Sequence, residues 1–136
     1  MTHVLLVGSE AALLEGLAQS LAALGHDPIV ATSLAEAREL AVLEPPLVLV
    51  VSRSLASSAG AELLAIPLAA GGARLLYRAA AIPLAPLLPA LQRSVLADLT
   101  LPLERHRLAA LVQSLGERAR VTGRTLRHSP PPDTRV

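Results

Sequence analysis

The sequence has no cysteine and no lysine, and Tyr77 is its only residue of the Phe, Trp and Tyr group. Without cysteine, disulfide bonds, thiol catalysis and thiolate metal sites are excluded. Without lysine, neither a Schiff base nor a P-loop lysine can form. What is present is a chain of 136 residues that is 52% hydrophobic, mostly Ala, Leu and Val. That length and content are enough for one domain with a single core.

Charge is spread unevenly, and all 12 basic residues are arginines. Residues 1–115 carry seven Arg and nine acids, a net charge of −2, whereas residues 116–136 carry five Arg and two acids, a net charge of +3. The beginning has no basic segment and reaches Glu10 too early for a signal peptide. The longest uncharged apolar stretch, 79–91, is shorter than the ~20 residues of a spanning helix and contains three prolines. We therefore expect a cytoplasmic protein that does not enter a membrane.

Short apolar runs recur along the chain at nearly regular intervals. They have the length and composition of buried parallel strands, which are apolar on both faces. The expected strands cover 3–7, 28–31, 47–51, 73–77 and 94–97.

Helical patterns lie between these runs, chiefly at about 10–24, 34–43 and 103–116. The first has Ser9 as its expected N-cap and Gly25 just past its end. The second opens with a capping box, in which Ser33 and Glu36 satisfy each other's backbone donors. A further helix before Pro67 should be short or kinked. Strands that alternate with helices predict an α/β fold: a doubly wound parallel sheet with right-handed crossovers.

This pattern occupies residues 1–116, which we expect to form one domain. Residues 117–136 contain arginines and end in "HSPPPDTRV", a composition that predicts a flexible tail. Basic residues on a flexible end could contact nucleic acid, but no aromatic side chains are interleaved with them to stack on bases. We therefore do not expect a nucleic-acid partner.

Four segments carry a resemblance to a known family: "HVLLVGSEAALLEGLAQSLAALGH", "ATSLAEARELA", "PLVLVVSRSLASSAGAELL" and "LTLPLERHRLAALVQSL". With the order of elements, they resemble the CheY-like receiver domain of two-component response regulators over roughly residues 3–116. The resemblance implies a flavodoxin-like five-stranded parallel sheet in the order 2-1-3-4-5, with helices on both faces. In that fold the ligand site lies at the carboxyl ends of the strands.

The catalytic positions of the family do not match. The resemblance places the two Mg²⁺-binding acids at Gly8 and Ser9, and the phosphoacceptor aspartate at Ser52. Phosphorylation of an aspartate needs a carboxylate nucleophile and a cation that clamps the phosphoryl group. A hydroxyl does not replace the carboxylate oxygens that a hard dication requires. The sequence therefore predicts a degenerate pseudo-receiver that is not an enzyme and holds no metal or cofactor.

The switch positions are also altered. The resemblance places the switch Ser/Thr at Arg78, the switch aromatic at Asp98 and the pocket lysine at Leu101. Arg78 and Asp98 carry opposite charges at the ends of strands that should be adjacent. We expect them either to form an ion pair that fixes the output face in one state or to leave Arg78 pointing into solvent.

Two classes of function remain open. The first is a stand-alone pseudo-receiver that acts as a phosphorylation-independent protein-interaction module in bacterial two-component signalling. The second is a small-anion or small-ligand binding domain that uses the remodelled pocket, with Ser9, Arg53 and Arg78 as candidate anion-binding residues. A homodimer is expected through the face of the fourth helix, fifth strand and fifth helix, because residues 82–91 are largely apolar and contain three prolines.

Overall fold

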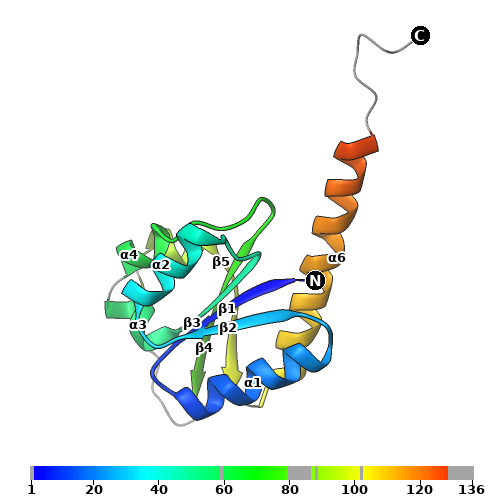
Figure 1. Ribbon diagram of the computed structural model, residues 1–136. Helices are drawn as coiled ribbons and strands as arrows, with labels where there is room; N and C mark the ends of the chain where they lie inside the picture. Colours follow the sequence, from blue (N-terminus) through cyan, green and yellow to red (C-terminus); the bar gives the residue numbers. More distant parts are fainter. Residues whose placement is uncertain (1, 59, 80–86, 88, 102, 129–136) are drawn as a thin grey trace, which may run out of the picture.

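A five-stranded parallel sheet in the order β2-β1-β3-β4-β5 forms the centre of the molecule (Figure 1). The computed structural model describes residues 2–58, 60–79, 87, 89–101 and 103–128. The strands are β1 His3–Val7, β2 Asp27–Ala31, β3 Val48–Ser52, β4 Ala73–Ala79 and β5 Val95–Leu101. This is the flavodoxin-like arrangement that the sequence predicts, and the expected strands are confirmed. The last strand continues beyond 97, so Asp98 lies within it rather than after it.

Helices cover both faces of the sheet. They are α1 Ala11–Ala23, α2 Leu34–Leu43, α3 Arg53–Ser58, α4 Gly60–Leu64, α5 Pro89–Ser94 and α6 Arg105–His128. Side chains of a strand alternate between the two faces, so Val4 and Leu6 of β1 join the core under α1 and α6. Leu5 and Val7 join the second core, under α2 to α5. The sheet is therefore buried on both faces, as its apolar strands require.

The ends of the first two long helices are only partly as expected. Ser33 caps α2 and accepts from the backbone N–H of Glu36 at 3.1 Å, while the Glu36 carboxylate accepts from the N–H of Thr32. Gly25 follows α1 with a φ of +90°, a conformation that glycine adopts without strain. The expected N-cap Ser9 is wrong. Glu10 occupies the cap position of α1, and the Ser9 hydroxyl donates instead to the Glu10 carboxylate.

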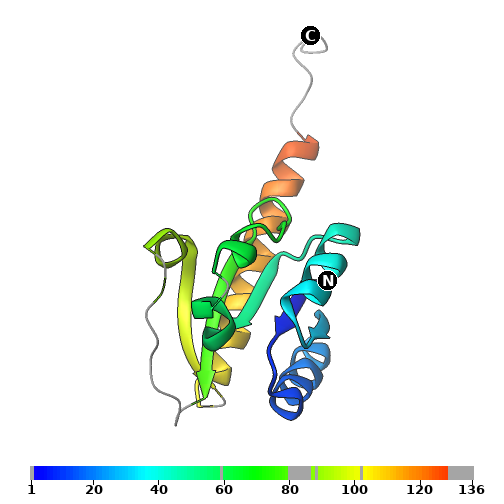
Figure 2. The ribbon, with the colours of Figure 1, turned by 90° about the vertical axis from the view of Figure 1, so that its left-hand side faces the viewer.

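The expected end of the last helix at 116 is also wrong, because α6 continues to His128. Gly116, which could have ended the helix, lies inside it and contacts Thr2, where an added Cβ would overlap the Thr2 hydroxyl. Between Gly116 and His128 the sequence contains no proline and only Gly123 as a glycine, so nothing strongly interrupts the helix. Figures 1 and 2 both show this part of α6 projecting from the body. No helix in the described ranges is long and apolar enough to span a membrane.

The proline-containing segments agree with the sequence where they are described. α4 ends before Pro67, and α5, which begins at Pro89 within the proline-containing segment 82–91, is only six residues long. Residues 80–86 and 88, which hold most of the expected apolar patch, lie outside the described residues, as do residues 129–136.

Candidate functional site

The carboxyl ends of β1, β3 and β4 meet at the edge of the sheet where a doubly wound fold usually binds its ligand. Gly8 follows β1, and its N–H donates to the carbonyl of Ala31 at 3.1 Å. Ser52 ends β3, is 3% exposed, and lies opposite Tyr77 of β4. The parallel register thus brings residues 8, 52 and 77 together from three strands.

Tyr77 fills the space between these strand ends. Its side chain is fully buried, and its hydroxyl donates to Glu10 Oε2 at 2.9 Å. Burial, followed by the hydrogen bond to Glu10 and the negative charge of that carboxylate, raises the pKa of Tyr77 well above its usual range. A hydrogen bond with Ser52 acts in the opposite direction but is outweighed. The phenol is therefore a neutral donor at any physiological pH.

The Tyr77 ring also explains why residue 8 is a glycine. The φ angle of Gly8 is not positive, so its backbone conformation does not require glycine. A Cβ at this position would overlap the Tyr77 hydroxyl and lie 3.1 Å from the ring carbon that carries it. No acid can stand at residue 8 while Tyr77 keeps this position. The Ser52 hydroxyl is also engaged, since it shares a hydrogen bond of 2.8 Å with Ser54.

Arg53 and Asp98 form an ion pair across the sheet, from the start of α3 to β5. The Arg53 side chain is 13% exposed and that of Asp98 36%. Among the described residues Asp98 pairs with Arg53, so of the two alternatives stated for Arg78 the ion pair with Asp98 is not the one formed. In the register of β4 and β5, Asp98 lies opposite Leu76, and Arg78 lies opposite Thr100, two residues further along.

Two predicted positions remain, Leu101 and Arg78. Leu101 is fully buried in the core under α1 and α6, to which Tyr77 also belongs. Arg78 is half-buried and close enough to Glu104 to contribute to the lowered pKa of that carboxyl. The larger causes of that shift are the hydrogen bond from the Thr100 N–H and the contact with Arg107.

The carboxyl edge of the sheet is less positively charged than its two arginines, Arg53 and Arg78, alone would make it. Ser9 is exposed and turned toward a carboxylate, and Arg53 is paired with Asp98. Glu10 adds a negative charge beside the Tyr77 hydroxyl. The three candidate anion-binding residues are therefore not assembled around an open pocket in the described part of the chain.

Tyr77 is the residue that the sequence analysis missed as part of the site. A signal was available, because the only tyrosine of the sequence lies on a predicted strand directly before Arg78, and a glycine follows another predicted strand two places away in the sheet. A position-by-position comparison with the receiver pattern does not show which side chain from another strand fills the space beside a small residue.

Comparison with known proteins places the fold. No protein-family model matches the chain, and no curated protein does. A receiver domain from Clostridium thermocellum matches with a TM-score of 0.69 at 14% identity, covering 90% of this chain and 99% of that one. A CheY-like receiver domain from Methanospirillum hungatei gives 0.64 at 21% identity, with 88% and 98% covered.

A pseudo-receiver is also among the similar structures. The pseudo-receiver domain of the CikA protein matches with a TM-score of 0.61 at 21% identity, covering 85% of this chain and 97% of that one. The class is thus a doubly wound α/β protein of the flavodoxin type. Within it, this chain has the fold of response-regulator receiver domains.

Proposed function

We propose that this protein is a pseudo-receiver, a phosphorylation-independent protein-interaction module of two-component signalling in the cytoplasm, without enzymatic activity. The observation that carries the proposal is the Tyr77 ring, which fills the space beside Gly8 and Ser52. The positions of the metal-binding acid and of the phosphoacceptor are therefore both without a carboxylate, and the space between them is closed to a phosphoryl group.

Treatment with acetyl phosphate and Mg²⁺ tests the proposal. The intact mass of the wild-type protein should not change, whereas an active receiver domain treated in parallel should gain a phosphoryl group. Ser52→Asp should also remain unmodified, because the variant restores the nucleophile but neither the metal ligands nor the open pocket. A phosphoryl adduct on the wild-type protein would overturn the proposal.

A small-anion binding domain is the alternative, and it has less support. Its pocket is occupied by Tyr77, and Asp98 neutralises one of its two arginines. Sulfate, phosphate and nucleotides should therefore leave the melting temperature unchanged. A rise in melting temperature that Arg53→Ala or Arg78→Ala abolishes would favour the alternative.

We also propose a homodimer through the face of α5, β5 and α6. β5 is the last strand of the sheet, and its Leu96 side chain is 54% exposed. An exposed leucine on an edge strand is a site where a second chain can pack. Light scattering should show a dimer that Leu96→Glu dissociates. Leu24→Glu, at a leucine that is 58% exposed beyond the end of α1, should leave the dimer intact. A monomeric wild-type protein at high micromolar concentration would remove this proposal.

A further inference from the structure

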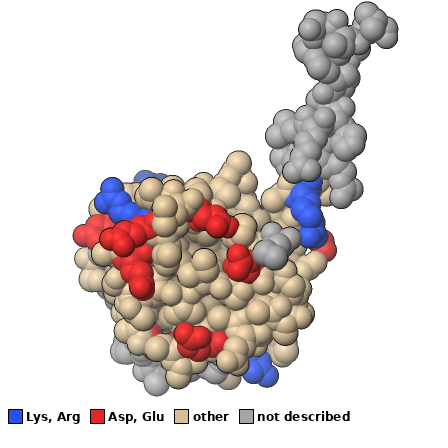
Figure 3. All heavy atoms as spheres, in the orientation of Figure 1, with Lys and Arg blue, Asp and Glu red and all other residues tan. Residues whose placement is uncertain are grey.

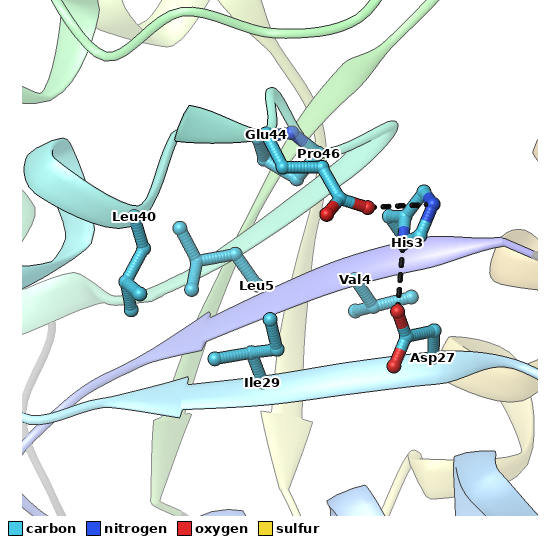
Figure 4. Close-up of a pocket in the computed structure, with 8 residues that line it drawn as sticks. All are labelled: His3, Val4, Leu5, Asp27, Ile29, Leu40, Glu44 and Pro46. Carbon is cyan, nitrogen blue, oxygen red and sulfur yellow. Dashed lines mark hydrogen bonds and ion pairs between the residues drawn. The ribbon is translucent and has the colours of Figure 1, made fainter. Parts of the chain in front are cut away.

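Three side chains with metal-binding atoms meet at the amino end of the sheet, opposite the filled pocket (Figure 4). His3 Nδ1 lies 2.8 Å from Asp27 Oδ2, and His3 Nε2 lies 2.8 Å from Glu44 Oε1. Each ring nitrogen thus faces a different carboxylate. None of the three residues has a part in the proposed pseudo-receiver function.

The fold brings these residues together from distant parts of the sequence. β1 and β2 are parallel and pair His3 directly with Asp27. Glu44 ends α2, where its N–H donates to the carbonyl of Leu40 at 3.0 Å. The chain then returns to the sheet, and the N–H of Leu47 donates to the carbonyl of His3 at 3.0 Å. The three positions are therefore fixed by backbone hydrogen bonds and not only by side-chain contacts.

The surroundings combine access from water with an apolar floor. The side chains of His3 and Asp27 are each 40% exposed, and that of Glu44 is 56% exposed. Beneath them lies a small pocket whose other lining residues are Val4, Leu5, Ile29, Leu40 and Pro46 (Figure 4). An ion from solvent can reach the three side chains, and the apolar floor supplies no competing polar group.

When the imidazole of His3 is neutral, it cannot donate a hydrogen bond to both carboxylates. A neutral ring has one N–H donor and one lone pair, so only one of the two carboxylates can receive a hydrogen bond. The other carboxylate oxygen then faces a second acceptor. A cation held between Nε2 and Glu44 removes this conflict, while the Nδ1–H donates to Asp27. A carboxylate that orients a metal-binding histidine in this way is a recurrent feature of metal sites.

We propose that His3 Nε2 and Glu44, with Asp27 orienting the His3 ring, form a binding site for a divalent transition-metal ion, for which Zn²⁺ is the probe. One ligand atom from each residue lies within 4.8 Å of the others. Tetrahedral zinc with bonds of about 2.0–2.2 Å needs ligand atoms about 3.3–3.6 Å apart. His3 Nε2 and Glu44 Oε1 are 2.8 Å apart without a metal, so the exposed Glu44 side chain has to rotate outward by less than about 1 Å to admit the ion between them. An imidazole nitrogen favours zinc over Mg²⁺, which prefers oxygen ligands.

Metal binding here would link β1, β2 and the end of α2. Because the three side chains converge only in the folded chain, zinc should stabilise the native state.

The experiment is a calorimetric titration of the untagged full chain with ZnCl₂ at pH 7.5, together with thermal unfolding. One equivalent of zinc should bind and raise the melting temperature, and MgCl₂ should do neither. His3→Asn and Glu44→Gln should each weaken zinc binding at least tenfold. His106→Asn and Glu39→Gln, which alter an exposed histidine and an exposed glutamate elsewhere, should bind as the wild type does.

Two results would overturn the proposal. The first is the absence of zinc binding by the wild-type protein at millimolar zinc. The second is binding that survives Glu44→Gln, or that His106→Asn removes as fully as His3→Asn does, since the metal would then lie elsewhere. Glu44 is mostly exposed, so its variant should fold even where a change at His3 perturbs β1.

Discussion

The two ends of the sheet differ in which side chains they bring together. The carboxyl end, where this fold places its ligand, is filled by the buried ring of Tyr77 and has one carboxylate, Glu10, at its centre. The amino end has no ligand site in the resemblance, yet His3, Asp27 and Glu44 converge there. On the face shown in Figure 3, acidic side chains lie at several places on the body of the molecule, and basic side chains lie where α6 begins to project from it. Retention of a fold therefore does not keep reactive groups at the position that the fold favours.

The physical difference between the ends is burial. At the carboxyl end the packing of buried side chains determines which substitutions are tolerated, because protein interiors are close-packed. At the amino end the charged side chains are about half-exposed, so ions from solvent can reach them and alter their interactions. The carboxyl end should therefore respond mainly to changes of volume and the amino end mainly to changes of pH.

The largest effect is expected for Gly8→Ala. The added methyl group overlaps the Tyr77 hydroxyl, and overpacking of this kind lowers the free energy of unfolding by about 1–3 kcal/mol. Urea unfolding measures the loss. The variant Tyr77→Phe should recover part of it in the Gly8→Ala background.

Gly16→Ala is the matched control: nothing lies within 4 Å of the added methyl group, and the free energy of unfolding should rise by up to about 1 kcal/mol. Equal effects at residues 8 and 16 would contradict the packing at the carboxyl end.

A smaller effect is expected for the ion pair between Arg53 and Asp98. A double-mutant cycle with alanine should give a coupling free energy near 1 kcal/mol, because Arg53 is only 13% exposed. The more exposed pair of Arg107 on α6 and Glu104, just before that helix, serves as the comparison, and its coupling should be weaker. Couplings of equal size would show that burial does not strengthen the pair at the carboxyl end.

The smallest effect concerns His26, which precedes β2 at the amino end. Burial, with smaller contributions from the chain's amino terminus and Arg120, lowers the pKa of His26 below 6.5. The unfolded chain therefore binds more protons, and the free energy of unfolding should decrease as the pH falls through 6.5. His26→Asn should remove this part of the pH dependence. His106→Asn, at an exposed position on α6, should retain it. An identical pH profile for wild type and His26→Asn would contradict the prediction.

Much of the fold could be predicted from sequence because its signals are local. The apolar strands, the Ser33 cap and Gly25 each depend on a few neighbouring residues, and the structure confirms them. The length of α6 was not predicted. Its buried face ends near Leu115, and the part beyond follows from backbone propensity and not from an apolar pattern.

The site was less predictable because its contacts join residues far apart in the chain. The residue types at positions 8, 9 and 52 could be compared with the receiver pattern one position at a time. The partner of Asp98 could not be inferred in this way, because it depends on a register shift between β4 and β5 near Arg74. The cluster around His3 was missed for a similar reason. Its members are 24 and 17 residues apart, from His3 to Asp27 and from Asp27 to Glu44. The pairing of β1 with β2 brings His3 to Asp27, and the return of the chain from α2 to the sheet brings Glu44 to them.

The contact between Gly8 and Tyr77 also restricts how this chain could change over evolutionary time. An acid at residue 8 brings a Cβ into the space of the Tyr77 hydroxyl, so that substitution is disfavoured while the tyrosine is present. A lineage that regained the acid would first have to replace Tyr77 and tolerate a cavity in its core, which is itself destabilising. Each of these single steps should therefore lower the free energy of unfolding. The two residues restrict each other's substitution, so an acid at residue 8 is difficult to introduce by ordinary stepwise substitution.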